Sequence, residues 1–235
     1  MHSTPRILED DMHTVRIWDL PTRIFHWALV VCVIGLVVTA NIGGNAMNWH
    51  FRFGYSVLTL LLFRVIWGLA GGRWSRFASF IYSPAELMRH LRGESPETHS
   101  VGHSPTGALS VFALLLVLLA QVTSGLFSDD EIAFAGPLTS LVSGDTVSMA
   151  TGYHKEVGKL IVIGLVVLHL LAIGYYRMVK KTDLIGPMIH GDKALIAEMA
   201  ASRDTAGSRM LALCIFGFCA FAVNRLIDFG ASSGF

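Results

Sequence analysis

Long apolar stretches constrain the fold of this chain more than any other feature of its sequence. A helix needs about 20 mainly apolar residues to cross the hydrocarbon core of a bilayer. Four stretches meet this length: 24–40, 49–70, 108–127 and 153–176. A fifth, 210–227, has an apolar centre interrupted by Asn224 and Arg225, and a helix resting on the membrane surface is its alternative interpretation. The sequence therefore predicts an all-α integral membrane helical bundle, with a fifth, C-terminal transmembrane helix.

The composition excludes several other classes of protein. Apolar residues make up 53% of the 235 residues and charged residues only 15%, whereas a soluble domain has about 25% charged residues. The net charge of +1 gives no basic field, so we expect membrane lipid and no nucleic acid as a partner. Cys32, Cys214 and Cys219 all lie in apolar runs, which indicates neither a disulfide framework nor a thiolate metal site.

The distribution of Lys and Arg among the connections predicts the orientation of the chain. Residues 1–23, 71–107 and 177–209 carry three, four and six of these residues, whereas 41–48 and 128–152 carry none. Cytoplasmic loops of membrane proteins concentrate positive charge. The N-terminus is therefore expected in the cytoplasm and, with five spans, the C-terminus in the periplasm. We expect a multi-pass protein of the bacterial inner membrane whose first span is an uncleaved signal anchor.

The spans divide the chain into four predicted parts. These are a cytoplasmic N-terminal tail (1–23), a four-helix core (24–178), a cytoplasmic connection (179–209), and a C-terminal transmembrane helix with an outer tail (210–235). Residues 83–93 predict a short amphipathic helix on the cytoplasmic leaflet, with Ser83 as its cap and Pro84 at its first position. The charged residues Lys155, Glu156 and Lys159 are interpreted as a turn at the boundary of the fourth span.

Four of the ten histidines lie near the ends of the spans, in two pairs of matching depth. His26 and His169 lie toward the predicted cytoplasmic face, and His50 and His154 toward the outer face. In a uniform α-helix, the 15 residues from His154 to His169 rotate the chain about 60° past four full turns, so the two rings share nearly one face. Imidazoles that face each other across a slot between helices can ligate one haem iron from both sides, which favours one-electron transfer. The pattern predicts two bis-histidine sites, one at each depth.

Other residues near these histidines have two interpretations each. Arg23, Arg52, Lys155 and Lys159 lie within a turn or so of the candidate ligands, and each is either a partner for haem propionates or an interfacial side chain. Five glycines leave helix surfaces free of side chains, which either makes room for a porphyrin or serves ordinary helix packing. They are Gly35, Gly54, Gly125, Gly158 and Gly164. The other six histidines, His103 among them, are expected to be solvated loop or tail residues.

Several short motifs follow one another in a characteristic order along the chain. They are residues 15–27 (VRIWDLPTRIFHW), 102–105 (GHSP), 125–130 (GLFSDD), 154–156 (HKE) with 168–169 (LH), and 184–189 (LIGPMI). This set resembles the bacterial dihaem cytochromes b, a superfamily that includes cytochrome b561 and the b-type subunits of nickel–iron hydrogenases. The resemblance extends over residues 15–193. It implies a four-helix core that binds two b haems through His26, His50, His154 and His169, with the fifth span outside this core.

The same resemblance implies a membrane electron carrier, acting as a quinone-linked oxidoreductase subunit between the quinone pool and an outer-face redox partner. A c-type cytochrome or a hydrogenase is a partner of this kind. The double histidine of the hydrogenase type is absent around His154, which favours a c-type cytochrome partner or a free-standing quinone-linked cytochrome.

Three other functions are compatible with parts of the sequence. One is a histidine-based proton or ion transporter that uses His154 and His169 as a relay. Another is a membrane di-metal oxygenase, which needs clustered histidines and carboxylates. The third is a superoxide:quinone oxidoreductase on the same fold, in which Lys155 and Arg52 attract the anion.

Overall fold

A computed structural model describes residues 13–196 and 198–232; residues 1–12 of the predicted tail, His2 among them, and residues 233–235 of the outer tail lie outside the described residues. Within these ranges, five helical stretches are long and apolar enough to cross a membrane. They are α1 (Leu20–Ile42), α2 (Met47–Ala70), α4 (Pro105–Leu126), the continuous stretch of α5 (Gly144–Gly152), a π-helical turn (Tyr153–Gly158) and α6 (Lys159–Met178), and α8 (Ala206–Ser232). The predicted all-α membrane bundle is confirmed.

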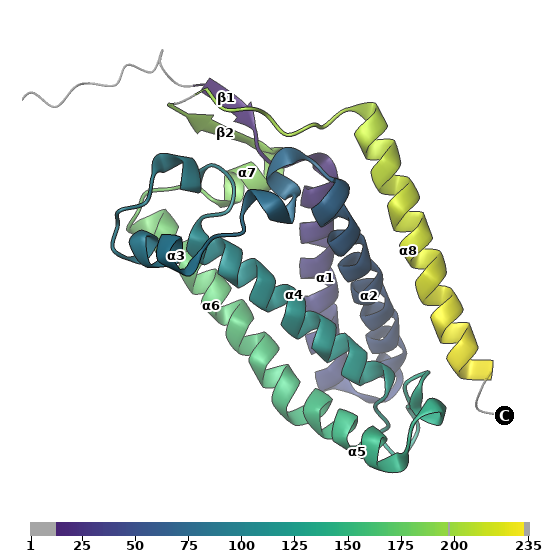
Figure 1. Ribbon diagram of the computed structural model, residues 1–235. Helices are drawn as coiled ribbons and strands as arrows, with labels where there is room; N and C mark the ends of the chain where they lie inside the picture. Colours follow the sequence, from purple (N-terminus) through teal and green to yellow (C-terminus); the bar gives the residue numbers. More distant parts are fainter. Residues whose placement is uncertain (1–12, 197, 233–235) are drawn as a thin grey trace, which may run out of the picture.

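The long helices lie side by side and end at two levels (Figure 1). α1 packs against α2, α4 against α6, and α8 against α2, so that α8 forms one edge of the bundle. One end of the bundle, here called the ribbon end, carries an antiparallel pair of strands, β1 (His13–Arg16) and β2 (Asp192–Leu195). The short helices α3 (Pro84–Leu91) and α7 (Ile185–His190) lie nearby. The opposite end, here called the loop end, carries the connection between α4 and α5. The strand pair was not predicted, because two strands of four residues give too short a pattern.

Several helix boundaries are set by side-chain caps. α1 begins four residues earlier than predicted because the Asp19 side chain accepts from a backbone N–H of the first turn. α4 begins three residues earlier than predicted, since Ser104 caps it in the same way. The amphipathic helix α3 has the predicted Ser83 cap, and the Glu86 side chain accepts from the Ser83 backbone to complete a capping box.

The fourth span is longer than predicted and contains no boundary turn. Helical structure runs without a break over residues 144–178, and Lys155 and Glu156 lie inside the π-helical turn. The interpretation of these charged residues as a turn is therefore wrong. Both side chains are exposed, so the helix continues beyond the apolar region without burying a charge.

A buried carboxylate, that of Asp19, joins α1 to α2 at the ribbon end. Its two oxygens accept hydrogen bonds from Thr22 N (2.8 Å), Trp67 Nε1 (3.1 Å), Gly72 N (3.1 Å) and Ser75 Oγ (2.7 Å). Asp19 is fully buried. A buried carboxylate is tolerated when donors saturate it, and these four donors come from α1, α2 and the turn that follows α2.

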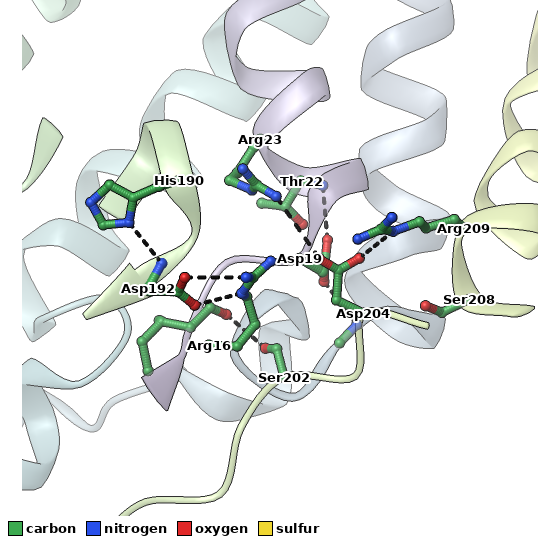
Figure 2. Close-up of polar contacts among 12 residues, drawn as sticks. Arg16, Asp19, Thr22, Arg23, His190, Asp192, Ser202, Asp204, Ser208 and Arg209 are labelled. Carbon is green, nitrogen blue, oxygen red and sulfur yellow. Dashed lines mark hydrogen bonds and ion pairs between the residues drawn. The ribbon is translucent and has the colours of Figure 1, made fainter. Parts of the chain in front are cut away.

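A second carboxylate, that of Asp204, attaches the start of α8 to the ribbon end (Figure 2). Asp204 Oδ2 lies 3.0 Å from Arg16 Nη1 and 3.9 Å from Arg23 Nη2, and Oδ1 accepts from Arg209 Nε at 2.8 Å. Arg16 also binds Asp192 through two nitrogens, which ties β1 to β2. The network therefore connects the strand pair, α1 and α8.

We expect Asp19→Ala to lower the free energy of unfolding by about 3 kcal/mol or more, because each buried donor left without an acceptor costs about 1–3 kcal/mol. Thermal unfolding in detergent, followed by circular dichroism, measures the change. Asp145→Ala, which removes an exposed carboxylate of α5, is the matched control. Equal melting of the two variants would contradict a central role for Asp19.

The attachment of α8 is expected to depend on pH. Burial raises the pKa of Asp204, but the hydrogen bond from Arg209 and the nearby arginine charges outweigh burial and hold this pKa below its ordinary value. A carboxyl group with a lowered folded-state pKa stabilises the fold above its unfolded pKa of about 3.9, and this stabilisation is lost as the pH falls through the folded-state pKa. Unfolding measured from about pH 6 to pH 3 is therefore expected to show an acid-dependent loss that Asp204→Asn reduces. An unchanged pH profile in this variant would contradict the assignment.

Candidate functional site

At the loop end, the structure brings His50 of α2 next to His154 of the π-helical turn. The centroids of the two rings lie 6.1 Å apart and their planes are nearly perpendicular, at 87°. With a metal–nitrogen bond of about 2 Å on each side, two imidazoles on opposite sides of one metal ion have ring centres roughly 6 Å apart. The spacing of this pair would therefore suit two histidines that hold one metal ion between them.

Each of these two rings is oriented by a backbone carbonyl of a neighbouring helix. His50 Nδ1 lies 3.1 Å from the Leu36 carbonyl oxygen in α1, and His154 Nδ1 lies 2.9 Å from the Gln121 carbonyl oxygen in α4. A carbonyl oxygen only accepts hydrogen bonds, so both Nδ1 atoms carry the proton and both Nε2 atoms keep a free lone pair. Histidines that ligate metals are commonly fixed in this way.

A cavity of about 730 Å³ lies at this histidine pair. It is lined mainly by apolar side chains of α1, α2, α4 and α6, and by both Gly54 and Gly125. A Cβ atom at Gly125 would lie 2.8 Å from the His154 ring, whereas one at Gly54 would meet nothing within 4 Å. Gly125 therefore makes room for the ligand ring and Gly54 leaves the cavity open. Gly35 and Gly158 instead face the side chains of Phe53 and Gln121, as glycines of ordinary helix packing do.

The basic residues predicted at the outer site fall into two groups. Lys155 and Lys159 line the cavity together with three acidic side chains, Asp129, Asp130 and Glu156. The guanidinium of Arg52 lies 4.8 Å from the centre of the Trp49 ring, and Arg52 is exposed. The structure therefore places the two lysines beside the histidine pair and Arg52 outside the cavity lining.

At the ribbon end, His26 of α1 and His169 of α6 are close enough to interact electrostatically. Both side chains are partly buried. Among the described residues, Nδ1 of His26 is buried without a hydrogen-bond partner. Arg23 lies one turn from His26, but its Nη1 donates to the Ile189 carbonyl at 2.6 Å. The second predicted pair thus lies within electrostatic range, and Nη1 of Arg23 donates to the backbone of α7.

The π-helical turn changes the relation between the two histidines of the fourth span. A π-helix has more residues per turn than an α-helix, so it rotates less per residue. The offset of about 60° between His154 and His169 is therefore wrong, because it assumes uniform α-helix. The turn contains His154 itself, and π-helical turns are frequent at functional sites.

Two polar residues near the ribbon-end pair were missed by sequence reasoning. His103, expected to be solvated, lies between the rings of Trp18 and Phe80, with centroid distances of 4.6 and 4.3 Å. Arg64 of α2 is only 3% exposed, and its guanidinium lies 4.6 Å from the centre of the Phe77 ring. An arginine inside an apolar span is rare, and that signal was available from the sequence.

Residues 17–191 match the family model of prokaryotic cytochrome b561. The chain belongs to this family. The resemblance drawn from the sequence motifs is therefore confirmed. Membership makes the chain a multi-pass membrane cytochrome b of electron transport, with haem b as the cofactor of the family.

Individual relatives are similar over most of the cytochrome. The "Probable Ni/Fe-hydrogenase 1 B-type cytochrome subunit" of Escherichia coli (strain K12) is 22% identical over 205 residues, covering 75% of this chain and 86% of the relative. The "Probable Ni/Fe-hydrogenase B-type cytochrome subunit" of Azotobacter chroococcum mcd 1 is 24% identical over 215 residues, covering 75% and 87%. The protein of the same name from Azotobacter vinelandii is 25% identical with the same coverage.

Proposed function

We propose that the cytochrome holds two b haems, one between His50 and His154 and the other between His26 and His169. The geometry of the loop-end pair supports this most directly, because its ring spacing and its free Nε2 atoms suit two imidazoles that hold one metal ion. A haem held by these residues would supply one-electron redox chemistry. The ribbon-end pair supports a second site at the other level of the bundle.

The other residues of the loop-end site orient the ligands and keep water out. The carbonyl groups of Leu36 and Gln121 fix the two imidazoles, and Gly125 leaves the space that the His154 ring fills. The apolar lining excludes water, which lowers the local dielectric. Lys155 and Lys159 are the cations available there to pair with haem propionates.

We further propose that electrons pass between the quinone pool and a redox partner on the periplasmic side, at the loop end. The Lys and Arg distribution supports this orientation. The connection at the loop end carries Asp129, Asp130 and Glu131. Backbone N–H groups of Phe134 and its two preceding residues lower the pKa of Asp130 to about 2, so this carboxylate stays charged. An acidic face suits a partner with a basic docking surface, such as a c-type cytochrome; a hydrogenase also fits, since the relatives above are named as hydrogenase subunits.

The alternatives have less support. Within residues 13–196 and 198–232, no group of three or more His, Cys, Asp or Glu side chains could hold a metal ion, which speaks against a di-metal oxygenase. If superoxide were the outer electron donor, the cavity would need a net positive charge to attract this anion. Three carboxylates line the cavity, however, against two lysines. A proton relay between His154 and His169 has no chain of polar side chains to support it in the apolar segment 160–168 of α6.

Replacing the ligands one at a time tests the pairing. We expect His50→Leu and His154→Leu to remove or convert the same haem, and His26→Leu and His169→Leu to affect the other, because each haem needs both of its ligands. Haem content, low-temperature absorption spectra and redox titration of the purified variants measure this. His190→Leu, at an exposed histidine, is the control and should keep both haems.

Two results would contradict the pairing. One is a single haem per chain in the unchanged protein, which would remove one of the two sites. The other is a spectrum of His154→Leu that matches that of His26→Leu, which would mean that ligands from different levels share a haem.

Reporter fusions test the proposed orientation. Alkaline phosphatase, which is active only outside the cytoplasm, is expected to be active when fused after Ser148 and inactive when fused after Asp192. The reverse pattern would place the loop end in the cytoplasm and overturn the naming of the outer partner.

A further inference from the structure

Two polar side chains at the ribbon end are buried with hydrogen-bonding atoms left free. Nη1 of Arg64 and Nδ1 of His103 are buried and have no hydrogen-bond partner among the described residues. The two side chains come from different segments, Arg64 from α2 and His103 from the residue before the cap of α4. They lie close enough to each other to interact electrostatically.

The buried guanidinium of Arg64 has no hydrogen-bonded anionic partner among the described residues. An unpaired buried charge is costly, and most buried cations in proteins have an anionic partner. The carboxylate of Asp19 is near enough to act on Arg64 through its charge, but its four hydrogen bonds come from other donors. The Phe77 ring offers only a cation–π contact. A hydrogen-bonding position for an anion therefore remains at Arg64.

His103 connects this position to the ribbon-end histidine pair. His103 interacts electrostatically with His26 as well as with Arg64. The rings of Trp18 and Phe80 hold His103 from two sides, so the imidazole has little freedom to turn toward solvent. Arg23, one turn before His26, also has a buried Nε atom without a partner among the described residues. The free donors thus gather around one of the two proposed haem sites.

We propose that Arg64 and His103 form a carboxylate-binding site that holds a propionate of the ribbon-end haem. The proposal rests on the proposed function, because it needs a haem between His26 and His169. A guanidinium is suited to a carboxylate by charge and by its planar set of donors. A positive charge held beside this haem favours the reduced state, so Arg64 raises the redox potential of the ribbon-end haem relative to a neutral side chain. A free oxyanion such as phosphate has the same chemistry, and the experiment separates the two.

Redox titration of the purified holoprotein gives the first measurement. Arg64→Gln is expected to shift the midpoint potential of the ribbon-end haem to a more negative value and to leave the loop-end haem unchanged. Arg64→Lys keeps the charge and is expected to shift it less. Arg52→Gln removes an exposed arginine of the same helix and serves as the matched control, with no shift at the ribbon-end haem.

Infrared spectroscopy gives a measurement that does not depend on the potential. Haem labelled with ¹³C in its propionate carboxyl groups is expected to reveal a carboxylate band in the reduced-minus-oxidised spectrum. This band should change in Arg64→Gln and in His103→Leu, and stay as it is in Arg52→Gln. If Arg64→Gln does not accumulate, His103→Leu carries the test, because it keeps the buried charge.

The outcomes that overturn the proposal are distinct from those that overturn the proposed function. A labelled band and a ribbon-end potential that are unchanged in both variants would exclude the propionate. A shift that depends on added inorganic phosphate, with an unchanged labelled band, would assign the site to a free oxyanion. In both cases the two haems and their histidine pairs would stand. Absence of the ribbon-end haem from the unchanged protein would instead contradict the proposed function itself.

Discussion

The saturated carboxylate of Asp19 is the interaction on which the relative placement of α1 and α2 depends. This carboxylate caps the first turn of α1. It also accepts hydrogen bonds from the indole N–H of Trp67, near the end of α2, and from the backbone N–H of Gly72 in the turn that follows. A carboxylate in an apolar interior requires its donors, so these elements cannot separate without exposing unpaired groups. His26 lies two turns into α1 and Arg64 one turn before Trp67, which means that the same contact sets the level of both residues.

At the loop end of α1 and α2, buried polar groups are satisfied in a different way. There the polar groups are imidazoles, and each is satisfied by a helical carbonyl of a neighbouring helix. Such a carbonyl already accepts within its own helix, but its second lone pair remains available. The rings are therefore oriented without any break in the helices that support them. The hydrogen bonds that the two rings donate to the carbonyls of Leu36 and Gln121 need α1, α2, α4 and the fourth span in register, so the site is a property of the packed bundle.

The sequence predicted the spans and the family, because hydropathy along one helix and the order of short motifs are local properties of the chain. It failed where partners from distant segments decide the outcome. The burial of His103 depends on Trp18 and Phe80, which come from two other parts of the chain. The strand pair depends on contacts between Arg16 and Asp192, which lie 176 positions apart in the sequence. The π-helical turn has no simple composition, and it altered both the predicted boundary and the predicted phase of the fourth span. The pairing of the histidines into sites stays a prediction that the proposed variants test.

The exposure of α6 has a consequence for what a molecule dissolved in the membrane can come near. This helix carries His169 and follows directly on the turn that carries His154, yet Leu160, Leu168 and Leu171 on its other faces are more than half exposed. In a membrane these leucines meet acyl chains. A helix with its side chains is about 10 Å across, so only one layer of protein separates the histidine pairs from the lipid. A hydrophobic molecule dissolved in the bilayer can diffuse laterally to either level along α6, and no gate between helices has to open for it to come near.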